Sequence, residues 1–171
     1  MASIFGHSAV SYTLARIIDN KKLKYLLVAA IFSSILPDVD VLAFKLGIAY
    51  EHPLGHRGIT HSILFAVVWA YILMKLFGNE EKKVWFSVIF LSTISHGVLD
   101  AMTDGGKGIG FFIPFINDRF FLPLRVIKIS PVGYKQFFSD WGIQVISSEI
   151  KYVLLPCSLI LLILYTFKKV R

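Results

Sequence analysis

Cysteine and charged residues are both scarce in this sequence. Cys157 is the only cysteine among 171 residues, so the chain forms no internal disulfide and cysteine-based metal ligation is almost excluded. Charged residues make up 17% of the chain, against about 25% in an average soluble domain. Hydrophobic residues make up 56%, and the mean hydropathy is +0.67. The composition therefore predicts a membrane protein in which any metal is held by His, Asp and Glu.

Several other familiar signals are missing. The glycine-rich stretch at 105–110 lacks the residue order of a phosphate-binding loop. Basic residues form no patterned patch, so nucleic-acid binding is not expected. No basic region precedes the first apolar stretch, which we expect to be retained rather than cleaved as a signal peptide. Because repeats and linkers are absent, we expect residues 1–171 to form a single membrane-embedded domain.

Apolar runs separated by polar turns predict an all-α fold. Residues 4–18 and 23–36 are expected to form short helices, the first roughly 22 Å long against a bilayer core of about 30 Å. Segments 59–77 and 84–102 are long enough to span, and a last apolar segment covers 150–167. Segments 41–54 and 111–131 are expected at the membrane interface, the second because it mixes aromatic and basic residues, and 132–148 is expected to form an amphipathic helical piece. We predict a polytopic helical bundle with four to five membrane-embedded helices and interfacial segments.

The polar stretch at 55–62, Gly-His-Arg-Gly-Ile-Thr-His-Ser, directly precedes a long apolar segment. Neutral imidazole is the commonest protein ligand for zinc-like metals, and His56 and His61 lie close enough in sequence to converge. The two glycines let the backbone turn tightly, and His61 and Ser62 are expected in the first turn of the following helix. Arg57 could clamp an anionic oxygen with its planar guanidinium, or reach to lipid phosphate as a membrane anchor.

Carboxylates and histidines recur at the ends of other apolar helices. Asp38 and Asp40 follow an apolar helix with no basic neighbour, where two carboxylates repel unless a cation or a proton separates them. A solvated turn is the alternative interpretation. His96 and Asp100 are four residues apart on one helix face, and both are costly in a membrane unless paired, protonated or metal-bound. His7 is either a further ligand or a helix-end histidine with one hydrogen bond.

The distribution of basic residues predicts the topology. With the segments laid out as alternating crossings, one side holds ten basic and three acidic residues, and the other holds eight of each. Lys and Arg in short loops mark the cytoplasmic side, so we expect a multi-pass protein of the inner (plasma) membrane with these loops in the cytoplasm. The candidate ligands then lie at the opposite face. The ten basic residues are Arg16, Lys21, Lys22, Lys24, Lys75, Lys82, Lys83, Lys168, Lys169 and Arg171.

Four motifs in this order resemble the YdjM-like family, a group of inner-membrane-associated proteins regarded as metal-dependent hydrolases. The motifs are His7, Leu-Pro-Asp-Val-Asp at 36–40, the 55–62 stretch, and Ser-His-Gly-Val-Leu-Asp at 95–100. The resemblance covers most of the chain. It implies functional roles for Asp100 with Thr103, and for a serine–glutamate pair that corresponds to residues 148–149. Asp104 lies outside the pattern, and we expect it to support the site.

A fainter similarity connects the chain with the zinc-dependent phospholipase C and P1 nuclease superfamily. That helical fold uses an early His, an Asp, further His, and a His-x-x-x-Asp pair around clustered zinc ions. The sequence lacks the second His-x-x-x-Glu pair that completes the superfamily's site. The similarity therefore implies fewer metal ions, or the recruitment of Glu149.

The residues and the resemblance together favour a membrane-bound metal-dependent hydrolase. We expect a phosphoesterase that acts on a lipid or lipid-linked substrate at the outer membrane face, among membrane lipids. The cofactors are expected to be divalent metal ions, zinc first, with manganese or iron as alternatives. Expected metal ligands are His7, Asp38, His56, His61, His96, Asp100 and Glu149, and expected catalytic residues are Asp38, Asp40, Arg57 and Thr60.

Two hypotheses from other classes stay open at this point. A transporter or ion and proton pathway also uses intramembrane His and Asp, but it needs polar residues along the whole membrane depth. The helix halves toward the expected cytoplasmic side, such as 66–73 and 84–91, are apolar. A structural membrane protein would use its His–Asp pairs to tie helices together. His52 lies outside the cluster and is a weaker candidate in every case.

Overall fold

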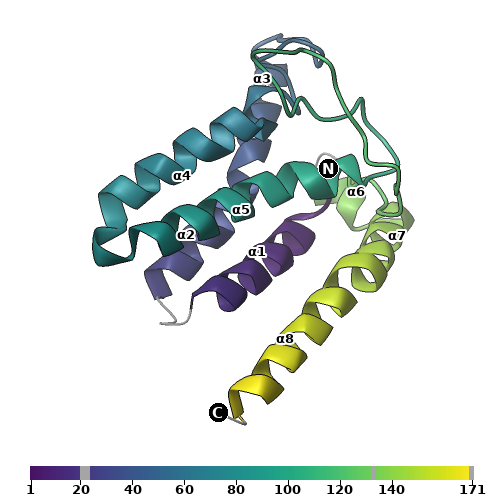
Figure 1. The fold of residues 1–171 in the computed structure, drawn as a ribbon. Coiled ribbons are helices and arrows are strands. Elements are labelled where there is room, and N and C mark those ends of the chain that lie inside the picture. The colour runs from purple at the N-terminus through teal and green to yellow at the C-terminus, as the bar shows by residue number, and fades with distance from the viewer. Residues whose placement is uncertain (20–23, 132–133, 170–171) are drawn as a thin grey trace.

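The computed structural model describes residues 1–19, 24–131 and 134–169. Helices α1 (Ile4–Ile18), α2 (Lys24–Ile35), α4 (Ile63–Phe77) and α5 (Lys82–Ala101) pack side by side as a bundle (Figure 1). Helix α7 (Asp140–Glu149) continues through a π-helical turn, Ile150–Leu154, into α8 (Leu155–Lys169). This long helix contacts α1 and then runs away from the bundle (Figure 1). The described residues contain helices and isolated β-bridges but no strand, which confirms the all-α prediction.

Three helical stretches are long and apolar enough to cross a membrane by length and composition. They are Lys24–Lys45, Asn79–Ala101 and Asp140–Phe167, while the apolar helix α4 is shorter, with 15 residues. Helix α1 also has 15 residues, about 22 Å at 1.5 Å per residue. The prediction of four to five membrane-embedded helices is therefore confirmed only as far as three candidate spans.

The helix predicted over residues 59–77 begins later than expected. Ile59–His61 forms a 3₁₀ turn (η2), and Ser62 then adopts an extended conformation in which its Oγ accepts a 3.1 Å hydrogen bond from the Phe65 N–H. A serine in this position is a strong N-cap, so α4 starts at Ile63. The expectation that His61 and Ser62 lie in the first helical turn is wrong, and His61 is held in front of the helix instead.

The interfacial segments contain little regular structure. Within 41–54 only α3 (Leu42–Lys45) is helical, and residues 111–131 form turns joined by isolated bridges. The predicted helical piece near 132–148 divides into α6 (Tyr134–Phe137) and α7. Residues 46–62 and 102–131 lie at the same end of the bundle as the N-terminus (Figure 1).

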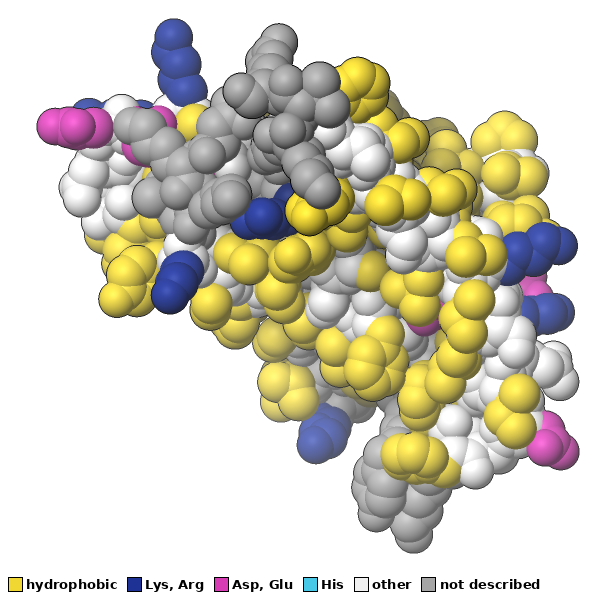
Figure 2. Space-filling view, turned by 90° about the horizontal axis from the view of Figure 1, so that it is seen from below, with side chains coloured by type: hydrophobic (Ala, Val, Ile, Leu, Met, Phe, Trp, Pro, Cys, Tyr) yellow, Lys and Arg dark blue, Asp and Glu magenta, His cyan; other side chains and the backbone are white. Residues whose placement is uncertain are grey.

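Apolar side chains fill the opposite end of the bundle. A buried cluster joins α1, α2, α4 and α5 there, and it consists of Ala15, Leu26, Ala30, Ala70, Leu73, Trp85, Val88 and Ile89. The hydrophobic residues on the outside of these helices cover much of the face shown in Figure 2, and no histidine is visible on it. Lys21, Lys22 and Arg171, on which part of the topology prediction rests, lie outside the described residues.

Glycine at position 58 is required by close backbone contact. A Cβ at Gly58 would lie 2.2 Å from the carbonyl oxygen of Pro53, which is far inside van der Waals contact. Arg57, directly before it, adopts a positive φ of 62°. The backbone before α4 therefore folds back tightly at this point, as the two glycines of the motif predicted.

We expect Gly58→Ala to destabilise the protein more than Gly47→Ala does. Gly47 has a φ of +71°, but a Cβ there meets open space, so its variant carries only the left-handed backbone cost of about 1–2 kcal/mol. Gly58 has a φ of −89°, so Gly58→Ala carries no left-handed cost, but it must displace the chain at Pro53. Thermal unfolding of both variants in detergent measures the difference, and equal losses would contradict the clash.

Candidate metal centre

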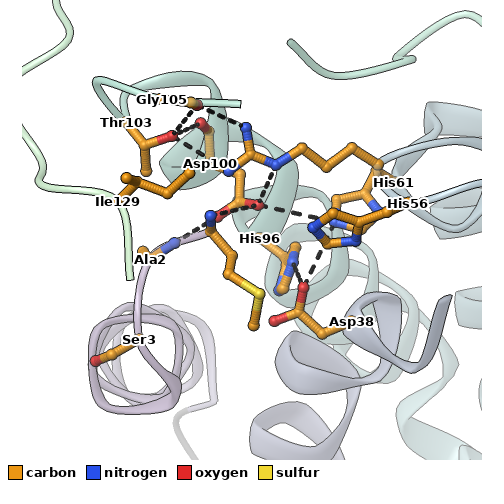
Figure 3. A network of polar contacts seen from close by, with 12 residues as sticks. Ala2, Ser3, Asp38, His56, His61, His96, Asp100, Thr103, Gly105 and Ile129 are labelled. Atoms are coloured by element: carbon orange, nitrogen blue, oxygen red, sulfur yellow. Dashed lines mark hydrogen bonds and ion pairs between the residues drawn. The ribbon is translucent and has the colours of Figure 1, made fainter. Parts of the chain in front are cut away.

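The chain directs four ligand residues from three segments to one point. Helix α2 ends in a 3₁₀ segment (η1, Leu36–Val41) with a proline in its first turn, and this segment carries Asp38. The turn η2 supplies His61, and the last two turns of α5 supply His96 and Asp100. One imidazole nitrogen or carboxylate oxygen from each of these four residues lies within 4.8 Å of all the others (Figure 3).

The four residues lie close together, but their facing atoms form no hydrogen bonds with one another. Asp38 Oδ1 is 3.3 Å from His96 Nε2 and 3.9 Å from His61 Nε2, and Asp100 Oδ2 is 3.9 Å from the same His61 nitrogen. None of these atoms has a hydrogen-bond partner among the described residues, although all are buried. Buried polar atoms are nearly always paired, because an unpaired one costs free energy. A divalent cation between the two carboxylates and two imidazoles would satisfy all four, so the residues fit a metal ion.

Both histidines are oriented for ligation through Nε2. Nδ1 of His96 lies 2.7 Å from the Ser34 carbonyl oxygen, which only accepts, so this nitrogen carries a proton, and in the neutral imidazole Nε2 keeps its lone pair. Nδ1 of His61 lies 3.1 Å from Asp40 Oδ2 and is fixed in the same way. Burial lowers the pKa of the His61 imidazole, against the opposing effect of the Asp40 hydrogen bond, which favours the neutral form that binds metals.

Asp40 holds the 55–62 stretch in place. Its Oδ1 accepts a 2.6 Å hydrogen bond from His56 Nδ1, and its Oδ2 accepts from the Arg57 backbone N–H at 2.9 Å and the Thr60 hydroxyl at 2.7 Å. The same oxygen lies 3.1 Å from His61 Nδ1. Asp38, Asp40 and His56 also place ligand atoms within 4.8 Å of one another. Both Asp40 oxygens already have donors, so the arrangement favours a positioning role for this carboxylate.

Arg57 is fully buried and is directed at Asp100. Its Nε lies 3.1 Å from Asp100 Oδ2, while its Nη1 donates to the Gly105 carbonyl and its Nη2 to the Thr103 hydroxyl, at 3.1 and 3.2 Å. The Ala2 backbone N–H donates to Asp100 Oδ1 at 2.6 Å (Figure 3). The guanidinium, which the sequence suggested could clamp an anion, therefore lies inside the protein and fixes a candidate ligand and the loop after α5.

His7 lies against the cluster from α1. Its ring stacks on that of His96 with centroids 3.8 Å apart, and its Nε2 is 3.5 Å from Asp100 Oδ1. Both of its nitrogens are buried without hydrogen-bond partners among the described residues. His7 is outside both groups of mutually close ligand atoms.

The structure does not bring Glu149 into either ligand group. Both of its oxygens accept hydrogen bonds from Ser3, one from the backbone N–H and one from the hydroxyl, each 2.5 Å long. Ser3 is also the N-cap of α1. Glu149 thus ties the start of α1 to the end of α7.

His52 and Asp104 lie apart from the cluster. His52 is exposed, and its Nδ1 accepts a hydrogen bond from the nearby Leu54 N–H at 3.1 Å. Asp104 is exposed as well, and its carboxylate accepts from Lys128 Nζ at 2.7 Å and from the Ile129 N–H at 3.0 Å. These contacts hold the loop after α5 to the segment before α6.

Three contributors to the site were not predicted from the sequence. They are the Ser34 carbonyl that orients His96, the Ala2 N–H that binds Asp100, and the Ser3 groups that bind Glu149. The first two are backbone groups, which carry no residue-type signal. Ser3 could have been noticed as a helix N-cap, but its partner lies 146 residues away.

We expect Glu149→Ala to lower stability without removing metal. The variant leaves the buried Ser3 groups without their charged acceptor, a loss of about 2 kcal/mol by analogy with other hydrogen bonds to charged groups. Thermal unfolding and metal content of the purified variant test this, with the exposed Glu51→Ala as matched control. Loss of metal from a folded Glu149→Ala protein would instead make Glu149 part of the metal site.

Comparison with known proteins places the chain in a family. The YdjM inner membrane protein family matches residues 1–170. The chain is 38% identical over 166 residues to the inner membrane protein YbcI of Escherichia coli (strain K12), covering 94% of this chain and 95% of that protein. No solved structure matches significantly, so the similarity to zinc-dependent phospholipase C stays a prediction. The family resemblance predicted from the four motifs is confirmed, and the chain belongs to the YdjM family of inner membrane proteins.

Proposed function

We propose that this protein is a membrane-bound metal-dependent hydrolase. The observation that supports the proposal is the group of four buried ligand atoms on Asp38, His61, His96 and Asp100, which lack hydrogen-bond partners in the described structure. Buried polar atoms without hydrogen bonds are rare in proteins, and clusters of buried titratable residues are typical of functional sites. Two imidazole nitrogens and two carboxylate oxygens suit zinc, with manganese and iron as alternatives.

The residues of the site divide into three roles in this proposal. Asp38, His61, His96 and Asp100 hold the ion, and His7 extends the site toward a second one. Asp40 orients His56 and His61 and anchors Thr60, and Arg57 fixes Asp100. A divalent ion held there would activate water at neutral pH and neutralise charge on a phosphoryl oxygen.

A phosphoester is the substrate class that we assign to this centre. Water adds to phosphorus, the bond to the leaving alcohol oxygen breaks, and that oxygen takes up a proton. Asp38 takes up the proton released by the water and passes it to the leaving alcohol oxygen; of the four ligand residues, Asp38 also lines a pocket of about 420 Å³. The position of the site in an inner membrane protein favours a lipid or lipid-linked substrate.

The position of the site in the bundle also supports a proposal for the side of the membrane that it faces. The site lies at the end of the bundle that carries the N-terminus and the 102–131 loop, away from the α4–α5 turn (Figure 1). That turn is one of the basic loops, so we propose that the turn is cytoplasmic, the chain crosses the membrane several times and the site faces the opposite side.

A transporter remains the main alternative, and the apolar end of the bundle argues against it. The buried cluster around Leu26, Ala70 and Ile89 joins all four bundle helices there. An ion path would need polar groups through that region. A purely structural role for the His–Asp cluster predicts that the protein binds no metal.

We expect detergent-purified wild type to hold near-stoichiometric divalent metal and to hydrolyse a phosphomonoester or phospholipid. His61→Ala and Asp100→Ala should lose metal and activity together, because each removes a ligand of the group. His52→Ala is the matched control, since His52 is exposed and outside the group. Mass spectrometry gives the metal content, and phosphate release gives the activity.

Each other result has a defined meaning. A wild type that stays metal-free after metal-replete purification would exclude the hydrolase and support a structural role. Metal binding without hydrolysis of any phosphoester tested would exclude the assigned reaction and retain the metal site. Equal metal content in wild type and His61→Ala would place the ion elsewhere.

We expect the α4–α5 turn to react with cysteine reagents only from the cytoplasmic side. In a Cys157→Ser background, Glu80→Cys probes the turn and Phe115→Cys probes the site end, and both positions are exposed. A membrane-impermeant maleimide added to inside-out vesicles should label the first and not the second, and intact spheroplasts should give the reverse. Labelling of Phe115→Cys in inside-out vesicles and of Glu80→Cys in spheroplasts would instead place the site in the cytoplasm.

A further inference from the structure

A pocket adjoins the candidate metal centre on the side of the N-terminus. It has a volume of about 420 Å³ and lies between the start of α1, the segment η1 and the region of α6. Small-molecule sites commonly measure about 300–1,000 Å³, so the pocket is large enough for one ligand group. The apolar residues of its wall are Met1, Ala2, Ile4, Phe5, Val41, Pro131, Phe137 and Phe138.

Few groups in this pocket can recognise a polar ligand. The polar side chains of the wall are Asp38, Ser3 and Ser130, and the Ser3 hydroxyl is already donated to Glu149. A sugar or a nucleotide needs several convergent hydrogen-bonding groups, which this wall does not offer. The wall is suited to an apolar chain.

The mouth of the pocket is apolar as well. Ile4, Phe5 and Phe138 are 55%, 63% and 84% exposed, although each also lines the pocket. Exposed apolar residues grouped in this way mark a contact with lipid or another apolar partner. In an inner membrane protein, such a mouth can admit a chain directly from the bilayer.

Asp38 joins the pocket to the metal centre. It lines the pocket and it is also one of the four ligand residues, with Oδ1 3.3 Å from His96 Nε2. Ala2, another wall residue, donates its backbone N–H to Asp100. An amphiphile with its chain in the pocket therefore has its headgroup at the ligand cluster.

We propose that this pocket binds one alkyl chain of an amphiphilic phosphoester and sets the substrate preference of the centre. The phosphate lies at Asp38 and the metal ligands, and the chain runs along Ile4, Val41 and Phe137 toward the bilayer. The inference rests on the proposed hydrolase for its reaction, but the binding of the chain can be measured without turnover.

Photocrosslinking tests the pocket directly. A dodecyl phosphate with a diazirine near its chain end, added to metal-replete protein, should label residues 1–5, Val41, 130–131 or 137–138. Val41→Trp fills the pocket and should lose most of this labelling, whereas Val67→Trp, on the exposed side of α4, should keep it. Unchanged metal content shows that the filled variant is folded, and Val41→Ala provides a second variant that widens the pocket and should retain the label. Labelling confined to α8, or equal labelling of wild type and Val41→Trp, would overturn the proposal.

Chain-length dependence separates this inference from the proposed function. Along a series of butyl, octyl and dodecyl phosphates, KM should fall by up to about fourfold for each methylene that enters the pocket. Val41→Trp should flatten the series and Val67→Trp should not, in the same detergent. Hydrolysis with the same chain dependence in wild type and Val41→Trp would overturn the pocket and keep the hydrolase. Absence of hydrolysis together with pocket labelling would overturn the reaction and keep the lipid site.

Discussion

The carboxylate of Asp40 is the interaction on which the candidate site depends. One side chain receives donors from His56, the Arg57 backbone and Thr60, and it lies against His61. These residues belong to a stretch with little regular structure of its own, which Arg57 also anchors to α5. Because Asp40 is in the 3₁₀ segment that ends α2, its bonds connect that helix to the turn before α4 and set the Nε2 atom of His61 toward Asp38.

A second carboxylate, Asp100, performs the same function for the other half of the site. It lies 3.1 Å from the Arg57 guanidinium and accepts from the Ala2 N–H, so the N-terminal segment and the 55–62 stretch both converge on α5. Arg57 also binds the Thr103–Gly105 turn. The two acids therefore have different roles. Both oxygens of Asp40 already accept hydrogen bonds from the protein, whereas Asp100 could still bind a cation although the Arg57 guanidinium lies beside it. A buried arginine in this position limits how much negative charge the cluster accumulates when no ion is bound.

The sequence predicted the members of the site better than their roles. The four-residue spacing of His96 and Asp100 was enough to place both on one buried face of α5, since helix geometry alone decides it. The apolar runs predicted the all-α fold correctly, but not the start of α4. The sequence pattern from residue 59 onward is typical of a continuous helix, whereas Ser62 caps the helix and makes it start at Ile63. Asp38 and Asp40 have the same side chain and are two residues apart, so only their three-dimensional contacts distinguish them. The Asp38 oxygens have no hydrogen-bond partner in the described structure, whereas Asp40 accepts hydrogen bonds from the 55–62 stretch. The contact of Glu149 with Ser3 spans almost the whole chain, and no local pattern predicts such a pair.

Metal binding would be coupled to the order of this site, because its ligands come from three separate segments of the chain. The large buried apolar cluster lies at the other end of the bundle, whereas the site end combines a smaller apolar cluster, which includes Ala2, Leu99 and Ile127, with buried polar atoms that lack hydrogen-bond partners in the described structure. Each unpaired atom costs about 1–3 kcal/mol, and a bound cation would remove several of these costs at once. An ion bound as proposed would therefore add to the packing that already holds the site end together. It would also fix Asp38, which lines the apolar pocket where the proposed substrate chain has to enter and leave.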